Sequence, residues 1–254
     1  PICKVRTICW THEADSMIIT NDQGNVDRPN NYILTRESGF KTITELTKGQ
    51  NCNGADTHPI NGELYFNSYN AGQVFRYDFN TKETIPLFTI QDSGWEFHIQ
   101  FHPSGDYAYI VVVNKHYILR SDYDWKTKRL TTPYIICGSQ GDAAWVDGVG
   151  KKARMNRPRQ GTFVKNPAYE GSNDEYDFYF CDRENHCIRI LTPQGRVTTF
   201  AGRGSNGTSG YNDGDLRQEA RFNHPEGIVY DEERECFFIG DRENRRIRKI
   251  GYEE

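Results

Sequence analysis

The sequence predicts an all-β fold, a β-propeller built of four-stranded blades, and three observations lead to this prediction. Residues 181–190 (CDRENHCIRI) return almost unchanged at 240–249 (GDRENRRIRK), so the chain contains a repeated turn. Each copy lies between runs of aromatic and alternating residues, as in two strands joined by a short turn. Such segments return about every 40 to 45 residues, which is typical of a propeller blade and longer than the repeat of a β-solenoid.

The composition agrees with one large β domain. Fifteen Tyr and fourteen Phe against two Met favour sheet, and 254 residues of which 36% are hydrophobic can bury a large core. The strands are apolar on both faces, as in Phe178, Tyr179 and Phe180, which suits blades stacked between neighbours. The net charge of −4 gives no global attraction to nucleic acid or acidic membranes. No apolar run reaches the roughly 18 residues that a membrane helix needs.

We expect a single domain over residues 1–254, divided into five units. The units cover roughly residues 10–50, 51–90, 91–137, 138–201 and 202–254. Lys4–Cys9 is similar to Arg196–Ala201, which ends the fourth unit, so residues 1–9 are expected to form the outer strand of a preceding or closing unit. The chain opens at Pro1 without a Met, and we therefore expect a piece of a longer polypeptide.

Within the first unit, strands are predicted at Ile18–Thr20 and Tyr32–Leu34. The segment Thr35–Ile43 aligns with Asp182–Ile190 and is interpreted as a diverged copy of the repeated turn. Further strands are expected at 61–66, 74–77 and 85–90 in the second unit and at 110–113 and 117–119 in the third. His58 and His102 precede Pro in equivalent turns of these units, so we interpret them as turn residues rather than metal ligands.

The seven cysteines are odd in number and contain no Cys-x-x-Cys spacing, so a zinc ribbon is not expected. Cys181 and Cys187 flank the repeated turn, where a disulfide across the hairpin and two buried free thiols are the alternatives. The free thiols are favoured, because Cys readily acts as a small core residue.

The last two units resemble the NHL repeat. In the fifth unit the matching residues are Ala201, Gly202, Asp213, Gly214, Ala220, Phe222, Asn223, Pro225, Gly227, Asp241, Asn244, Ile247 and Arg248. In the fourth they are Asp147, Gly148, Ala153, Asn156, Pro158, Asp182, Asn185, His186, Ile188 and Arg189. The resemblance covers residues 138–250, and the earlier units rest on propeller periodicity alone.

This resemblance implies a six-bladed propeller of the NHL/TolB-like type, of which about five blades lie in this chain. The chain is most similar to the propellers of gut-bacterial cell-surface proteins that carry an upstream immunoglobulin-like IPT/TIG domain. Some of those proteins have a provisional hydrolase name. A location at the cell surface or in the periplasm of a bacterium is therefore expected, together with an upstream domain in the full-length chain.

In a propeller, the loops that enter the innermost strands and those that join the second and third strands meet at the mouth of the central channel. Aligning the units places there Cys52, Asn53, Trp95, Glu96, His98, Arg159, Gln160, Asn223, His224 and Glu226, with Arg36, Arg183 and Arg242 around them. An exposed ring of such side chains would suit a polar ligand. The repeated residues Asp182, Asn185 and Arg189 are interpreted as structural, because every repeat needs the same turn. The residues predicted to bind ligand are Trp95, Glu96, His98, Arg159, Gln160, His224 and Glu226.

The leading functional hypothesis is a noncatalytic binding propeller that holds a glycan or peptide at the channel mouth, with no cofactor. The alternative is a lactonase-like hydrolase that uses a divalent cation such as calcium. Its metal ligands would be Asn53, Glu96, Asn223 and Glu226. RNA binding is the third hypothesis, and it is disfavoured because no stacking aromatic residues are interleaved with the basic cluster at residues 151–159. Gly202–Gly207 matches Gly-x-Gly-x-x-Gly, but loop sequence rather than a helix follows, so no dinucleotide site is expected.

Overall fold

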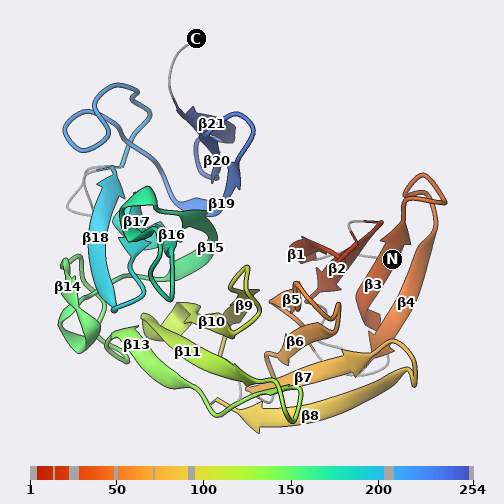
Figure 1. Ribbon diagram of the computed structural model, residues 1–254. Coiled ribbons are helices and arrows are strands. Elements are labelled where there is room, and N and C mark those ends of the chain that lie inside the picture. The colour runs from red at the N-terminus through yellow and green to blue at the C-terminus, as the bar shows by residue number, and fades with distance from the viewer. Residues whose placement is uncertain are drawn as a thin grey trace. The chain divides into compact units, whose positions relative to one another are not determined.

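A computed structural model describes residues 5–13, 15–22, 29–48, 51–70, 72–90, 95–202 and 209–251. The strands form five sheets, the blades of an all-β propeller (Figure 1). The prediction of four-stranded blades, about five of them in this chain, is confirmed. Most of the Gly202–Gly207 segment, and Cys3, lie outside the described residues.

The blades follow one another along the chain, and their strands have the following bounds. Blade 1 contains β1 (Val5–Trp10), β2 (Ser16–Asn21), β3 (Pro29–Thr35) and β4 (Ile43–Lys48). Blade 2 contains β5 (Ala55–Thr57), β6 (Leu64–Ser68), β7 (Gln73–Asp78) and β8 (Glu83–Thr89). Blade 3 contains β9 (Phe97–Phe101), β10 (Tyr107–Val112), β11 (Tyr117–Asp124), β12 (Arg129–Leu130) and β13 (Tyr134–Gly138). Blade 4 contains β14 (Gly148–Val149), β15 (Pro158–Lys165), β16 (Tyr176–Asp182), β17 (Cys187–Leu191) and β18 (Arg196–Ala201), and blade 5 contains β19 (Pro225–Asp231), β20 (Cys236–Asp241) and β21 (Arg246–Ile250).

The chain divides into two compact units. The first comprises Pro1–Ile110 and Arg120–Tyr134, and the second comprises Val111–Leu119 and Ile135–Glu254. Single-turn 3-10 helices occur at Val113–Lys115, Gly150–Lys152, Pro167–Tyr169 and Arg183–Asn185. Within the described residues no helix has the length and apolar character needed to cross a membrane.

The expectation that residues 1–9 form an outer strand is wrong for the part that the structure describes. Strand β1 pairs with β2 of its own blade, with Ile8 opposite Ile19 and Cys9 opposite Ile18. It has the first place in the order β1-β2-β3-β4, as β5 has in blade 2. Inner and outer strands share the same alternation of residues, so the similarity between Lys4–Cys9 and β18 did not specify a position in the blade.

The alignment of Thr35–Ile43 with the repeated turn is also wrong. Residues 36–40 form the turn between the third and fourth strands of blade 1, whereas residues 183–186 join the second and third strands of blade 4. Successive hairpin turns of an antiparallel sheet lie at opposite ends of its strands. Arg36 therefore lies at the other end of its blade, where its guanidinium carbon is 5.6 Å from the ring centre of Trp10.

The strands of blade 4 are buried on both faces, as their aromatic runs predict. Phe178 and Phe180 are fully buried with stacked rings, while Tyr179 between them points the other way. The ring of Tyr179 lies 5.0 Å from Phe200 of the same blade and 4.8 Å from Phe237 of blade 5. Neighbouring blades of this unit are thus held together by apolar contact between their faces.

The first and last sheets carry large apolar side chains that no described residue covers. In blade 1, Val5 is 49% exposed and Ile8 is 55% exposed. In blade 5, Val229 is 55% exposed and Ile247 is 72% exposed, whereas Ile188, the residue of blade 4 that corresponds to Ile247, is fully buried. Apolar faces of this kind are typical of surfaces that pack against another element.

The pair Ile188 and Ile247 tests how much the covered face contributes to stability. We expect Ile188→Thr to lower the free energy of unfolding by roughly 2 kcal/mol or more, because it removes buried apolar surface and buries a hydroxyl. The matched change Ile247→Thr should cost less than about 0.5 kcal/mol, because that side chain is exposed. Urea unfolding of both variants measures the difference, and equal losses would show that Ile247 is covered in solution.

Candidate functional site

The repeated polar residues of blade 4 form a buried hydrogen-bond network. Asp182 accepts hydrogen bonds from Arg189 Nη1 at 2.7 Å and from Asn185 Nδ2 at 2.8 Å. Its other oxygen accepts from the backbone N–H of Asn156 at 2.7 Å, and Asp182 and Arg189 are both fully buried. In blade 5 the same bonds are made by Asn223, Asp241, Asn244 and Arg248. Asp182, Asn185 and Arg189 are structural, as predicted, and with their counterparts in blade 5 they fix the β16–β17 and β20–β21 turns.

The two turns and the inner strands bring a cluster of three arginines around one carboxylate. From Glu226 Oε1, the distance to Arg183 Nε is 2.9 Å, to Arg242 Nη1 3.3 Å and to Arg159 Nη2 3.7 Å. The side chains of Arg159 and Arg183 are each 11% exposed, while Glu226 is 35% and Arg242 is 50% exposed. The cluster therefore extends from a buried base to an open edge.

A second carboxylate continues the cluster. Glu184 accepts a hydrogen bond from Arg183 Nη1 at 2.9 Å, and its other oxygen lies 3.2 Å from His224 Nε2. His224 Nδ1 in turn lies 2.9 Å from Asn223 Oδ1. The sequence interpretation did not single out Glu184, although its place beside Arg183 in the repeated turn was the available signal. We call Arg159, Arg183, Glu184, His224, Glu226 and Arg242 the arginine–glutamate cluster.

Histidines in left-handed turn positions connect successive blades of this unit. His186 Nδ1 accepts the backbone N–H of His224 at 3.2 Å, and His116 Nδ1 accepts that of Arg157 at 3.1 Å. Both histidines have positive φ, 56° for His186 and 66° for His116. Burial, with nearby positive groups, lowers the pKa of both imidazoles below the ordinary histidine value. Low pKa suits the role, because only an unprotonated Nδ1 can accept a hydrogen bond.

The predicted residues of the first unit lie where β5 meets β9. Asn67 Oδ1 accepts the backbone N–H groups of Asn53 and Gly54, each at 2.9 Å, and Asn67 Nδ2 donates to Phe97 O at 3.1 Å. A Cβ on Gly54 would lie 2.6 Å from the Cα of His98, so only glycine permits this approach. Asn67, which the sequence interpretation missed, thus fixes the segment that carries Asn53.

The expectation that Trp95 and His98 belong to an exposed ring is wrong. Trp95 is 7% exposed and His98 is 6% exposed, and Glu96 is partly buried. For His98 the reason is the close approach of Gly54, which directly precedes β5, to the backbone of β9. Their role in ligand binding, like that of the partly buried Gln160, stays a prediction.

Several groups that could act in catalysis are bound in structural roles. Burial raises the pKa of the Cys181 and Cys187 thiols, and both are free, as favoured from the sequence. Burial also raises the pKa of Asp56 to about 7, but its oxygens accept the backbone N–H groups of Thr57 and Phe101. His58 Nδ1 accepts the N–H of Ile60, so this histidine is the turn residue predicted.

The residues proposed as metal ligands meet other partners. Glu226 faces three guanidinium groups, whose positive charge opposes a cation at the same carboxylate. Asn223 Oδ1 lies against His224 Nδ1. Among the described residues, no group of three or more His, Cys, Asp or Glu side chains is placed to hold a metal ion.

Solved structures with the same fold share much of this sequence. An auxiliary nutrient binding protein from Bacteroides thetaiotaomicron is 91% identical over 100% of this chain, with a TM-score of 0.97. A protein of the same name from Bacteroides ovatus is 44% identical over 98% of the chain, with a TM-score of 0.94. A third protein, from Bacteroides thetaiotaomicron and provisionally named a phosphatase, is 42% identical over 98% of the chain, with a TM-score of 0.92.

The chain spans about 60% of the length of these relatives, with 60%, 59% and 61% covered respectively. A virginiamycin B lyase from Staphylococcus aureus, 14% identical with a TM-score of 0.57, shares the fold alone. No family profile and no curated protein matches the chain.

The histidine connections predict an acid-sensitive fold. The pKa of His186 is lower in the folded protein than in the unfolded chain. As the pH falls below about 6.5, the unfolded chain therefore takes up a proton before the folded protein does, and the free energy of unfolding decreases. His186→Asn should reduce this loss, since Asn Oδ1 can occupy the place of Nδ1 without titrating and asparagine tolerates positive φ. Unfolding midpoints of parent and variant between pH 7.5 and 5 provide the measurement. If the unfolding midpoints of the two proteins differed by the same amount at every pH, the role of His186 would be contradicted.

Proposed function

We propose that this chain is a noncatalytic ligand-binding propeller module that takes a polar ligand, a glycan or peptide, at the arginine–glutamate cluster. The observation that carries the proposal is the convergence of three guanidinium groups on one oxygen of Glu226. An arginine offers five N–H donors in a fixed plane, suited to the hydroxyls and carboxylates of such ligands. The open edge at Arg242 would give a ligand access to them.

The charge balance of the cluster supports binding rather than acid–base catalysis. Each carboxylate is held by a guanidinium or imidazole partner, so neither lies in the apolar surroundings in which a catalytic acid is usually found. The names of the two nutrient-binding relatives support the same class of function. A binding role for Trp95, Glu96 and His98 in the first unit stays a separate prediction.

The wider setting of the module is proposed from the NHL resemblance and from these relatives. We place it at the cell surface or in the periplasm of a bacterium, in a longer protein with an upstream domain of the IPT/TIG kind. A six-bladed NHL-type propeller is the proposed complete domain. The exposed apolar faces of blades 1 and 5 support this, because a further blade would cover such a face.

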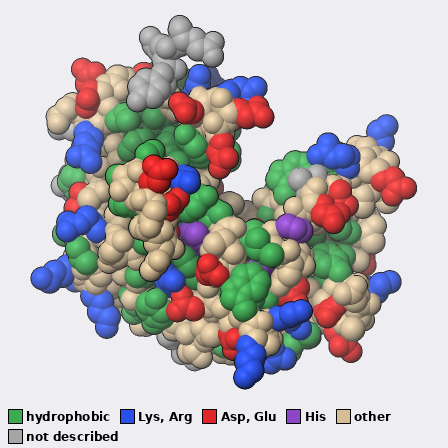
Figure 2. All heavy atoms as spheres, in the orientation of Figure 1, with side chains coloured by type: hydrophobic (Ala, Val, Ile, Leu, Met, Phe, Trp, Pro, Cys, Tyr) green, Lys and Arg blue, Asp and Glu red, His purple; other side chains and the backbone are tan. Residues whose placement is uncertain are grey.

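Nucleic acid is not the proposed ligand. On the face shown in Figure 2, Lys and Arg side chains are scattered, with Asp and Glu between them. The basic segment at residues 151–159 is divided as well, since Arg154 pairs with Asp142 and Arg159 with Glu226. A continuous basic surface would be needed to follow a phosphate backbone.

Replacing Arg242 tests the site. Glycan and peptide arrays identify a ligand for the parent chain, and titration calorimetry then measures its affinity. Arg242→Gln should weaken binding about tenfold, because a charge-assisted hydrogen bond is lost at an exposed position where the fold tolerates change. Arg234→Gln is the matched control, an exposed arginine of the same blade that pairs with Asp231. Equal affinity of both variants would place the ligand elsewhere.

The hydrolase alternative is favoured by one relative's provisional phosphatase name and makes the opposite prediction. A metal-assisted enzyme should hydrolyse a phosphate ester or lactone in the presence of calcium, and Glu96→Gln and Glu226→Gln should each abolish turnover. The binding proposal expects no calcium-dependent turnover from the parent chain. Activity in the parent that both variants lose would overturn it.

A further inference from the structure

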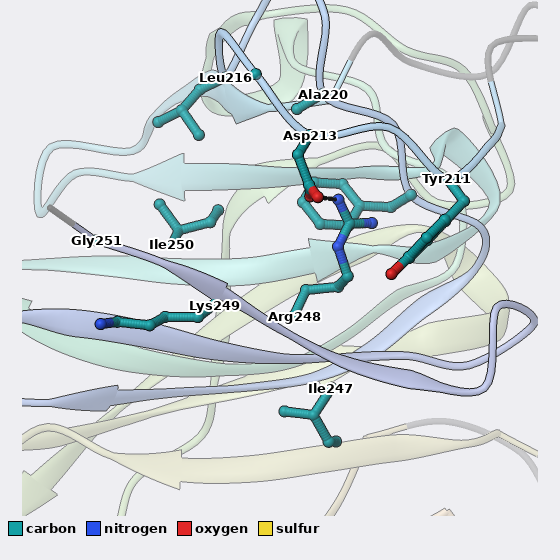
Figure 3. A pocket seen from close by; sticks show the side chains of 11 residues that line it. Tyr211, Asp213, Leu216, Ala220, Ile247, Arg248, Lys249, Ile250 and Gly251 are labelled. Atoms are coloured by element: carbon teal, nitrogen blue, oxygen red, sulfur yellow. Dashed lines mark hydrogen bonds and ion pairs between the residues drawn. The ribbon is translucent and has the colours of Figure 1, made fainter. Parts of the chain in front are cut away.

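The structural arginines of blades 4 and 5 are matched by carboxylates of their own. Arg189 Nη1 lies 2.7 Å from Asp182, and its Nη2 lies 2.9 Å from Asp147. Arg248 of blade 5 faces Asp213 in the same way (Figure 3). Burial opposes the charge of Arg189, but the attraction of Asp182 is foremost among the contacts that outweigh it, and the pKa of Arg189 lies above the ordinary arginine value.

The carboxylates of the arginine–glutamate cluster are shared instead. Arg183 Nε lies 2.9 Å from Glu226 Oε1, and its Nη1 lies 2.9 Å from Glu184. The same oxygen of Glu226 also lies 3.3 Å from Arg242 and 3.7 Å from Arg159. One carboxylate oxygen therefore faces three guanidinium groups.

The positive charge of Arg183 is only partly balanced as a result. Burial lowers the pKa of Arg183 below the ordinary arginine value, and the charges of Arg159 and Arg242 lower it further, while its two glutamates do not offset this effect. The shift is opposite in direction to that of Arg189, although the Arg183 side chain is 11% exposed and that of Arg189 is fully buried. Another negative group beside Arg183 would therefore stabilise the cluster.

The surrounding residues supply little of this negative charge. Glu243 lies 3.5 Å from the outermost arginine of the cluster, but the two side chains are 47% and 50% exposed, so water weakens their attraction. At the same end of the neighbouring blades, Arg157 and Lys115 add to the effect of burial in lowering the pKa of His116, although Asp142 opposes them. Positive charge therefore predominates in the adjacent turns as well.

We propose that the arginine–glutamate cluster recognises a carboxylate group of its ligand, and that Glu226 is a built-in competitor for the same guanidinium groups. This inference rests on the proposed function and narrows the ligand to an acidic one. A guanidinium presents paired N–H donors in one plane, which match the two oxygens of a carboxylate. A sugar acid and the free C-terminus of a peptide share this chemistry.

The position of Glu226 suits a competitor. Its side chain is 35% exposed, whereas those of Arg159 and Arg183 are each 11% exposed. The turn that carries Arg183 is fixed independently of Glu226 by the hydrogen bond between Asp182 and Asn185. A ligand carboxylate that displaces Glu226, or shares its arginines, then needs no rearrangement of the backbone.

Paired probes that differ only in the acidic group test the proposal on the 254-residue chain. The pairs are methyl glucuronide with methyl glucoside, and N-acetylalanine with its amide. Titrations followed by saturation-transfer NMR should show that the acid of one pair binds about tenfold more tightly than its neutral partner, because the neutral partner lacks charge-assisted hydrogen bonds. The pair that shows this preference identifies the source of the carboxylate.

Replacing the competitor gives a result that a structural role would not give. Glu226→Gln should tighten binding of the preferred acid about fivefold, because glutamine keeps an acceptor oxygen while a competing negative charge is removed. Glu233→Gln is the matched control. It removes the same charge from the exposed turn between β19 and β20, at the other end of the blade, and should leave the affinity unchanged.

Equal binding within both pairs, or no binding of any probe at millimolar concentration, would overturn the inference. So would weaker binding of the acid by Glu226→Gln, or competition by inorganic sulfate as strong as that of the acid itself. A neutral array ligand whose binding Arg242→Gln weakens would overturn the inference and leave the proposed function standing. Acid binding that neither Glu226→Gln nor Arg242→Gln changes would contradict both. The paired probes leave the protein unaltered, so the first outcome does not depend on whether a variant folds.

Discussion

The buried pair of Asp182 and Arg189 is the interaction on which the fourth blade depends. Removing two charges from water costs several kcal/mol per ion, and their attraction offsets this only where the remaining donors and acceptors are also satisfied. Here Asp182 accepts from Asn185 and Asn156, and Arg189 donates to two backbone carbonyls and to Asp147. The pair therefore fixes a turn, the preceding loop and two strands at once, and blade 5 repeats it.

The same network explains why charged residues gather at one end of these blades. Asp182 ends β16, so the next two residues, Arg183 and Glu184, stand in a rigid turn rather than a mobile loop. Side chains held in this way lose little conformational entropy when a ligand binds. A structural repeat thus becomes a site wherever its turn carries polar residues that the network does not use.

Much of the fold could be predicted from the sequence, and the failures have a common cause. Strand positions and the structural role of Asp182 follow from the apolar pattern and from the repeated turn, and both can be seen in the sequence itself. The place of Val5–Cys9 within a blade depends on which strand it pairs with, and the burial of His98 depends on the approach of Gly54 to β9. Both features depend on tertiary contacts. The alternation of side chains along a strand is the same for an inner strand and for an outer one, so it does not specify the position. The pairing of Glu184 with His224 spans two blades, so no local pattern predicts it.

Blade 5 repeats the bonds that Arg189 makes in blade 4. Arg248 makes its bonds to Asp241, Asn212 and Asp213 although no described strand lies beside β21. The network of blade 5 is therefore made by the loop before the blade together with the β20–β21 turn, and it is local to the repeat.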